Sequence, residues 1–182
     1  MSRSLSTYAA ILAGALALAS PVSAQVMVGG APMYASKTIA ENAPNAPNLS
    51  TLVAAVKAAG LVDTLASKGP FTVFAPTDKA FGKLPAGTVE TLVKPENKAT
   101  LTKILTYHVV SGNYSAKELM AGAKKKGGMH LTSVEGAPLT VKMSKGKLIV
   151  IDQKGNGSVI QTADVKQKNG VVHVIGSVLM PK

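Results

Sequence analysis

The hydrophobic pattern of the chain changes near residue 122, and this change limits the possible folds more than any other feature. Before it, apolar residues recur at helical spacing, as at Leu49, Leu52, Val53 and Val56, and Gly60 stands where such a helix would end. After it, apolar and polar residues alternate in short runs, which is typical of strands. The expected strands span 129–132, 138–143, 147–151, 159–163 and 170–175. A helical half followed by a strand-rich half indicates an α+β fold.

The first 24 residues have the pattern of a secretory signal peptide. Arg3 lies in a short polar start, an apolar run covers 8–19, and Pro21 follows it. Small residues before Gln25 then predict cleavage at that point. The apolar run is well below the ~20 residues that a membrane-spanning helix needs. We therefore expect an exported protein, periplasmic or secreted, with no transmembrane segment after cleavage.

Residues 25–47 are predicted to be a flexible leader, and residues 48–182 a single domain. The leader contains Gly29-Gly30 and three prolines, and no hydrophobic period is sustained across it. Asn48 is a good helix N-cap and starts the first regular pattern. The domain therefore should begin at this residue.

Composition excludes several classes of protein. The chain has no cysteine, so disulfide scaffolds, thiolate metal sites and thiol catalysis are ruled out. It also lacks tryptophan and has only 4% aromatic residues, too few to build extended base-stacking surfaces. Its formal net charge is +11, and Arg3 is its single arginine. Positive charge carried by lysines suits diffuse attraction to anionic surfaces. Bidentate hydrogen bonds to phosphate or guanine are typical of arginine, so no nucleic-acid partner is expected.

Three sequence blocks occur in order within the predicted domain. The first, over 71–81, reads FTVFAPTDKAF; the second, over 105–112, reads LTYHVVSG; the third, over 170–181, reads GVVHVIGSVLMP. In this arrangement the chain resembles the fasciclin-like domain family, over residues 48–181. The third block departs from the family pattern at Gly176, where relatives usually have an acidic residue.

The resemblance implies N-terminal helices packed on an antiparallel β-sandwich or wedge. It also implies a non-enzymatic adhesion or matrix-interaction role, with no cofactor. The family motifs assign structural roles to six residues: Phe74, Pro76, Thr77, Phe81, His173 and Pro181.

The residues of these blocks have a physical interpretation of their own. A strand over 71–74 must stop at Pro76, which has no backbone donor, and Thr77 can cap the helix that follows. The three phenylalanines all lie in this block and are expected to be core residues. His173 alternates with valines in the last strand, so we expect it to be buried and hydrogen-bonded.

The sequence offers no catalytic or metal-binding constellation. His108, His130 and His173 are too far apart in sequence for the usual zinc-ligand spacings. No nucleophile-elbow, phosphate-binding or paired-carboxylate motif is present. We expect no catalytic residue, no metal and no cofactor.

The Tyr107-His108 pair allows two interpretations. The pair is predicted within a strand over 107–110. In relatives this segment has been associated with receptor contact, so the resemblance implies that both side chains contact a partner. The alternative is that they fix the junction between a helix and this strand.

Lysines are frequent between residues 117 and 147: this segment contains seven lysines and only two acidic residues, Glu118 and Glu135. Lys124, Lys125 and Lys126 lie in a glycine-flanked segment and are candidates for contact with an anionic lipid or polysaccharide surface. A solvated surface without a partner is the alternative.

Two functions remain open from the sequence. The first is adhesion to a cell-surface or matrix protein or to an anionic surface. The second is a binding module for a small apolar ligand or lipid, which an apolar cavity lined by Val, Leu and Met would favour. N-glycosylation sequons occur at Asn48, Asn113 and Asn156.

Overall fold

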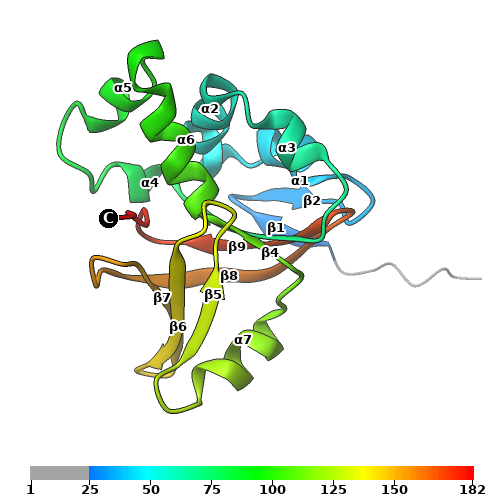
Figure 1. The fold of residues 1–182 in the computed structure, drawn as a ribbon. Helices are drawn as coiled ribbons and strands as arrows, with labels where there is room; N and C mark the ends of the chain where they lie inside the picture. Colours follow the sequence, from blue (N-terminus) through cyan, green and yellow to red (C-terminus); the bar gives the residue numbers. More distant parts are fainter. Residues whose placement is uncertain (1–24) are drawn as a thin grey trace, which may run out of the picture.

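A seven-stranded sheet organises the molecule, and the computed structural model describes residues 25–182 of it (Figure 1). The predicted signal peptide over 1–24 lies outside the described residues. The strands lie in the order β4-β3-β9-β8-β7-β6-β5. Their bounds are β3 Phe71–Pro76, β4 Val109–Ser111, β5 Met129–Thr132, β6 Pro138–Ser144, β7 Lys147–Ile151, β8 Gly157–Gln167 and β9 Gly170–Ile175.

The sheet is antiparallel except for one pair. β3 pairs in parallel with β9, and Phe74 lies opposite His173 in that register. This pairing brings the first and third sequence blocks side by side, about 100 residues apart in the chain. The expected antiparallel wedge is therefore correct apart from this one parallel pair.

The sheet closes on itself at one end only. A single bridge joins Val110 of β4 to Ser133 beyond β5, and the Val134 amide donates to the Val109 carbonyl at 2.7 Å. Away from this bridge the two edges diverge, and α7 (Ala116–Ala123) packs against β5, β6 and β7. Figure 1 shows β5, β6 and β7 running across the direction of β8 and β9, which gives the sheet its wedge shape.

The remaining helices gather on the opposite side of β3 and β9 (Figure 1). They are α1 Ile39–Asn42, α2 Ser50–Ala59, α3 Val62–Ala66, α4 Asp78–Phe81, α5 Thr88–Leu92 and α6 Lys98–Tyr107, with 3-10 turns at Ala43–Asn45, Pro47–Leu49 and Pro95–Asn97. As expected, Gly60 ends α2 in the left-handed conformation, and the Thr77 side chain accepts from the Ala80 amide at the start of α4.

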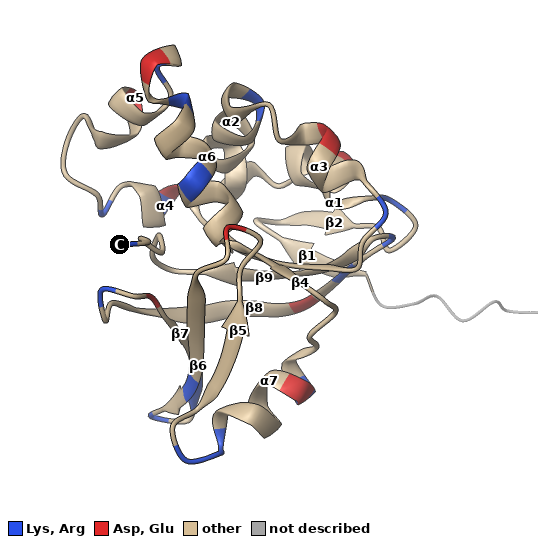
Figure 2. Ribbon diagram, viewed as in Figure 1, with Lys and Arg blue, Asp and Glu red and all other residues tan. Residues whose placement is uncertain are grey.

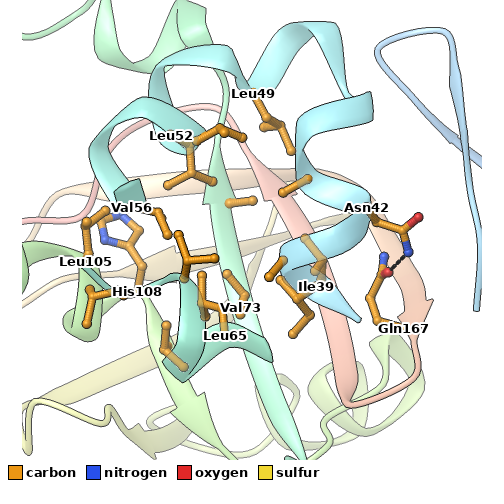
Figure 3. Close-up of a pocket in the computed structure, with 18 of the residues that line it drawn as sticks. Ile39, Asn42, Leu49, Leu52, Val56, Leu65, Val73, Leu105, His108 and Gln167 are labelled. Atoms are coloured by element: carbon orange, nitrogen blue, oxygen red, sulfur yellow. Dashed lines mark hydrogen bonds between the residues drawn. The ribbon is translucent and has the colours of Figure 1, made fainter. Parts of the chain in front are cut away.

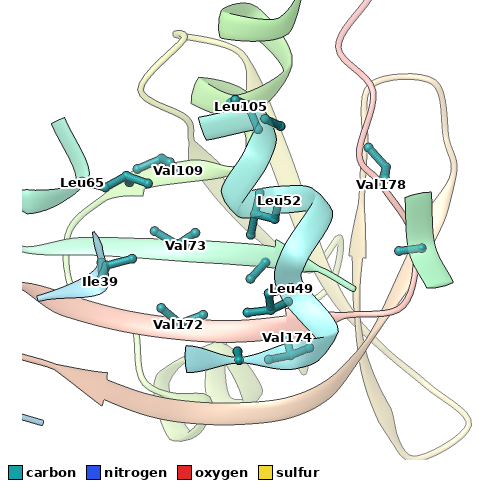
Figure 4. Close-up of a cluster of buried hydrophobic side chains, with 14 of the residues drawn as sticks. Ile39, Leu49, Leu52, Leu65, Val73, Leu105, Val109, Val172, Val174 and Val178 are labelled. Carbon is teal, nitrogen blue, oxygen red and sulfur yellow. The ribbon is translucent and has the colours of Figure 1, made fainter. Parts of the chain in front are cut away.

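Two hydrophobic cores lie on the two sides of β3 and β9. Val73, Val172 and Val174 face the helices, as Figure 4 shows for this cluster. Phe74 and Ile175, which alternate with them, face the inside of the wedge together with Leu119 of α7. β3 and β9 are therefore buried on both faces, and the expected burial of phenylalanines is confirmed for Phe74 and Phe81.

The segment 25–47 differs from the predicted flexible leader. It forms a hairpin of β1 (Val26–Val28) and β2 (Ala31–Met33), followed by α1. Val28, Met33 and Ile39 are buried in the helix-side core. The glycines and prolines of this segment make tight turns between short elements, and contacts with the rest of the chain stabilise those elements.

Two element boundaries also differ from expectation. Asn48 is not an N-cap, because a 3-10 turn covers Pro47–Leu49 and α2 starts at Ser50 without a side-chain cap. Tyr107 ends α6 instead of starting a strand, and His108 is the helix C-cap. Within residues 25–182, no helix is long and apolar enough to cross a membrane.

Candidate functional site

The Tyr107 and His108 side chains lie in the interior, with 0% and 2% of their surface exposed. The Tyr107 hydroxyl donates to the Pro138 carbonyl at 3.0 Å and accepts from the Gln153 amide at 3.1 Å. Burial raises the pKa of this hydroxyl to about 12. Neither side chain reaches the surface, which favours the structural interpretation of the pair over direct contact with a partner.

His108 links the end of α6 to the C-terminal block. Its Nε2 accepts from the Leu179 amide at 2.9 Å, so its Nδ1 carries the proton and donates to the Ile104 carbonyl at 2.8 Å. Burial lowers the pKa of this imidazole to about 4. His108 is therefore a neutral structural bridge, which is the second of the two interpretations of the Tyr-His pair.

His173 makes an equivalent bridge at the start of α7. Its Nδ1 accepts from the Asp164 amide at 3.3 Å, and its Nε2 donates to the Tyr114 carbonyl at 2.8 Å. Its ring stacks on Phe74, with 5.8 Å between ring centroids. Burial lowers the pKa of His173 as well. The prediction of a buried, hydrogen-bonded histidine is confirmed.

The other motif residues predicted to be structural are also in the interior. Pro76, Thr77, Phe81 and Pro181 are all buried. Gly176 donates its amide to the Val159 carbonyl, and the Lys83 ammonium donates to the Gly176 carbonyl at 2.6 Å. No group of three or more metal-ligating side chains occurs in the part of the chain that the structure describes.

The predicted lysine contact lies on the surface. Lys124, Lys125 and Lys126 are exposed in the loop between α7 and β5, and Lys142, Lys145 and Lys147 are exposed on the β6–β7 hairpin. We call these six residues the basic tip. Figure 2 shows lysines on this loop and on this hairpin at the same end of the molecule.

The lysine loop lies directly against the hairpin because of Gly128. A Cβ at this position would lie 2.6 Å from the Val141 carbonyl oxygen and 2.6 Å from Cγ of Lys142. The two glutamates nearest in sequence are elsewhere. Glu118 is at the start of α7, where it completes a capping box with Ser115, and Glu135 is in the β5–β6 turn, 3.9 Å from the Lys103 ammonium. The basic tip therefore has no acidic side chain of its own.

An apolar cavity of about 90 Å³ separates α2 and α3 from β3 and β9 (Figure 3). Leu52, Leu65, Val73 and Leu105 are among the aliphatic side chains on its walls, and Met33 comes from the N-terminal hairpin. Figure 3 shows His108 at one end and the hydrogen-bonded pair Asn42 and Gln167 at the other. This matches the kind of cavity that would favour the ligand-binding alternative.

The buried polar side chains on the cavity wall already have protein partners, whereas Lys57 and Thr64, which also line the cavity, are exposed residues. Both ring nitrogens of His108 are used, and the Asn42 carboxamide bonds to the Tyr34 backbone and to Gln167. The Thr106 hydroxyl donates to the Thr102 carbonyl at 2.8 Å. The buried part of the cavity therefore presents an apolar surface on which no polar side chain is free to hydrogen-bond a ligand.

Comparison with known proteins agrees with the motifs. The family model described as Fasciclin domain matches residues 47–181. The chain belongs to the fasciclin domain family. Among solved structures, the fasciclin fold here is similar to a FAS1 domain pair from the insect cell adhesion molecule Fasciclin I. The TM-score is 0.70 at 22% identity, over 79% of this chain and 51% of that one.

Several curated proteins resemble this fasciclin domain in sequence. Protein sll1483 of Synechocystis sp. is 48% identical over 155 residues, which cover 85% of this chain and 79% of the relative. Immunogenic protein MPB70 of Mycobacterium bovis is 41% identical over 79% of this chain and 68% of its own. Cell surface glycolipoprotein MPB83 of the same species is 40% identical over 81% of this chain and 62% of its own.

Sequence reasoning missed the residues that attach segment 25–47 to the fasciclin domain. The Asn169 side chain accepts from the Ile39 amide at 3.0 Å and donates to the Leu65 and Ser67 carbonyls. Asn42 and Gln167 make a second link. An Asn-Gly pair at 169–170 was a visible hairpin signal, but its partners lie about 100 residues or more away and nothing local identifies them.

Proposed function

We propose that this fasciclin domain is an exported, non-enzymatic surface-interaction protein that attaches through its basic tip to an anionic surface. The single observation that carries the proposal is the gathering of six exposed lysines at one end, without an acidic side chain among them. The names of similar proteins, a cell adhesion molecule and a cell surface glycolipoprotein, support a role at the cell surface.

The engagement of the two buried histidines supports a non-enzymatic role. Histidine is the commonest general acid or base in catalysis, and it needs a free nitrogen that can reach a substrate. Both nitrogens of His108 and of His173 are instead bonded to backbone groups.

The attachment proposal is tested by neutralising the loop lysines. Changing Lys124, Lys125 and Lys126 together to Gln should lower binding to intact cells of the source by at least tenfold, since each basic residue near an anionic surface contributes about 1 kcal/mol. The melting temperature should hardly change, because all three side chains are exposed. Sedimentation of bound protein with the cells measures the effect.

A matched control removes the same charge elsewhere. Lys79, Lys94 and Lys154 are exposed and lie outside the basic tip. If their joint change to Gln reduces attachment as much as the loop variant does, binding follows net charge alone, and the basic tip is not the contact.

The cavity of Figure 3 favours a second candidate function, binding of a small apolar molecule. Its volume of about 90 Å³ is smaller than the roughly 150 Å³ of an engineered cavity that holds benzene, so the ligand would be small or would insert only a chain end. Because the buried polar groups on the walls are already paired, the part of the ligand inside the cavity would be a neutral hydrocarbon-like group.

Val73→Ile tests this candidate by adding one methyl group to the cavity wall. Wild-type protein should show methyl NMR shifts of the lining residues under xenon, and the variant should show reduced shifts and higher stability by about 0.5–1 kcal/mol. Wild-type protein with no response to xenon would remove this candidate and leave the attachment proposal unaffected.

A further inference from the structure

The turn of the β6–β7 hairpin holds a lysine in an unfavourable backbone conformation. Lys145 has φ of 49° and Gly146 has φ of 77°, and the pair connects Ser144 to Lys147. A two-residue turn with positive φ at both positions prefers Asn-Gly or Gly-Gly. Lysine is disfavoured at the first of these positions because its Cβ is crowded by the backbone in the left-handed region.

Within residues 25–182, Asp164 is the one other non-glycine residue with a positive φ, and its conformation serves contacts inside the fold. Asp164 has φ of 56°, its carboxylate accepts from the Ala116 amide at 2.6 Å, and its amide donates to His173. These bonds position the start of α7. The strained backbone at Asp164 is therefore compensated by contacts inside the fold.

Lys145 has no such compensation. Its side chain is exposed, and among the described residues its ammonium makes no hydrogen bond or ion pair. Residues kept in sparsely populated backbone regions cluster at functional sites. A lysine in a strained backbone conformation, exposed in the turn of the β6–β7 hairpin without a partner among the described residues, indicates a contact outside the chain.

We propose that Lys145 is the leading contact residue of the basic tip and that the partner is an anionic polymer bearing carboxylate or phosphate groups. The inference rests on the proposed attachment function and names its main residue and partner. Lysines form two neighbouring groups here, one on the α7–β5 loop and one on the hairpin, so an extended polyanion can contact both at once. Flexible ammonium groups suit such repeated point charges.

The surface composition favours a polymer over a bilayer. A protein that enters a membrane interface usually presents large apolar side chains beside its lysines. The exposed large hydrophobic residues of the described chain lie outside both 124–128 and 142–147; they are Met27, Tyr34, Val62, Val93, Met120, Val134 and Val159.

Lys145→Asn should raise the stability of the protein and weaken its binding to the polymer. Asparagine tolerates the left-handed region, so the melting temperature should rise by about 2–4 °C. Binding to polygalacturonate and to inorganic polyphosphate should weaken by about fivefold at low salt, the loss expected for one basic residue at an anionic surface. Lys147→Asn, which removes a neighbouring charge without relieving strain, should weaken binding less.

Lys154→Asn is the control outside the basic tip and should leave both polymers bound as in the wild type. The proposal is overturned if Lys145→Asn binds as well as Lys154→Asn, or if its melting temperature does not rise. If the triple loop variant also binds normally, the attachment function itself fails. Tighter binding to phosphatidylglycerol vesicles than to both polymers would overturn the polymer as partner.

Discussion

Two buried histidines hold the fasciclin domain together by the same arrangement. Each accepts one backbone amide and donates to one backbone carbonyl, so each must be neutral to make both bonds. His108 connects α6 to Leu179, and His173 connects β9 to the segment before α7. Protonation would replace the accepting nitrogen by a donor and break one bond in each bridge.

This arrangement predicts that stability falls on mild acidification. Burial lowers the pKa of His108 to about 4 and lowers that of His173, whereas an unfolded histidine titrates near 6.5. Below the unfolded value the unfolded chain binds more protons than the native protein, so the free energy of unfolding decreases as the pH falls. From about pH 7 to about pH 5, His108 alone should account for about 2 kcal/mol.

Urea unfolding at the two pH values measures this change. His108→Gln should lose much of the pH dependence, whereas His130→Gln, at an exposed position, should keep it. Equal unfolding free energies for wild-type protein at both pH values would contradict the neutral-bridge assignment.

At the scale of single elements, the glycines after α7 determine where the lysine loop lies. Gly127 and Gly128 both have positive φ, of 93° and 88°. A Cβ on Gly127 would meet nothing within 4 Å, whereas a Cβ on Gly128 would meet the backbone of β6. An added side chain at Gly127 therefore costs only the unfavourable backbone conformation, whereas one at Gly128 also costs a steric clash.

We predict that Gly127→Ala lowers the free energy of unfolding by about 1 kcal/mol, the cost of a left-handed residue with a side chain. Gly128→Ala should cost clearly more, about 2–3 kcal/mol, and should also weaken attachment by displacing the loop from the hairpin. Chemical unfolding of both variants gives the comparison. Equal losses would show that the loop does not depend on the close approach at Gly128.

Elements with a local signal were predictable from the sequence, and elements without one were not. The end of α2 at Gly60 and the cap of α4 by Thr77 are confirmed, since their bonds lie within a few residues. The segment 25–47 was predicted to be flexible because it has no local helix or strand pattern. Its hairpin and short helix are stabilised by distant residues, Asn169 and the helix-side core. Tyr107 was assigned to a strand because Tyr-His-Val-Val favours strands locally, although tertiary packing keeps it in α6.

The same distinction applies to the candidate sites of the whole molecule. Exposure of the lysine loop followed from its flanking glycines, and burial of His173 followed from its alternation with valines. The joining of two lysine groups into one tip depends on the close approach of the lysine loop to β6 at Gly128, which the chain does not specify locally. The cavity could not be predicted either, because its walls come from segments between residues 28 and 172.

The central claim is that attachment is electrostatic and located at the basic tip. Contacts between exposed lysines and an anionic surface weaken as salt screens them, over a Debye length of about 10 Å at 0.1 M and about 3 Å at 1 M. The most direct test is the affinity of wild-type protein for intact cells, measured over this salt range beside the Lys124, Lys125 and Lys126 to Gln variant. We predict a steep loss of wild-type affinity with salt and a flatter dependence for the variant. Affinity that is independent of salt, or the same slope for both proteins, would contradict the account.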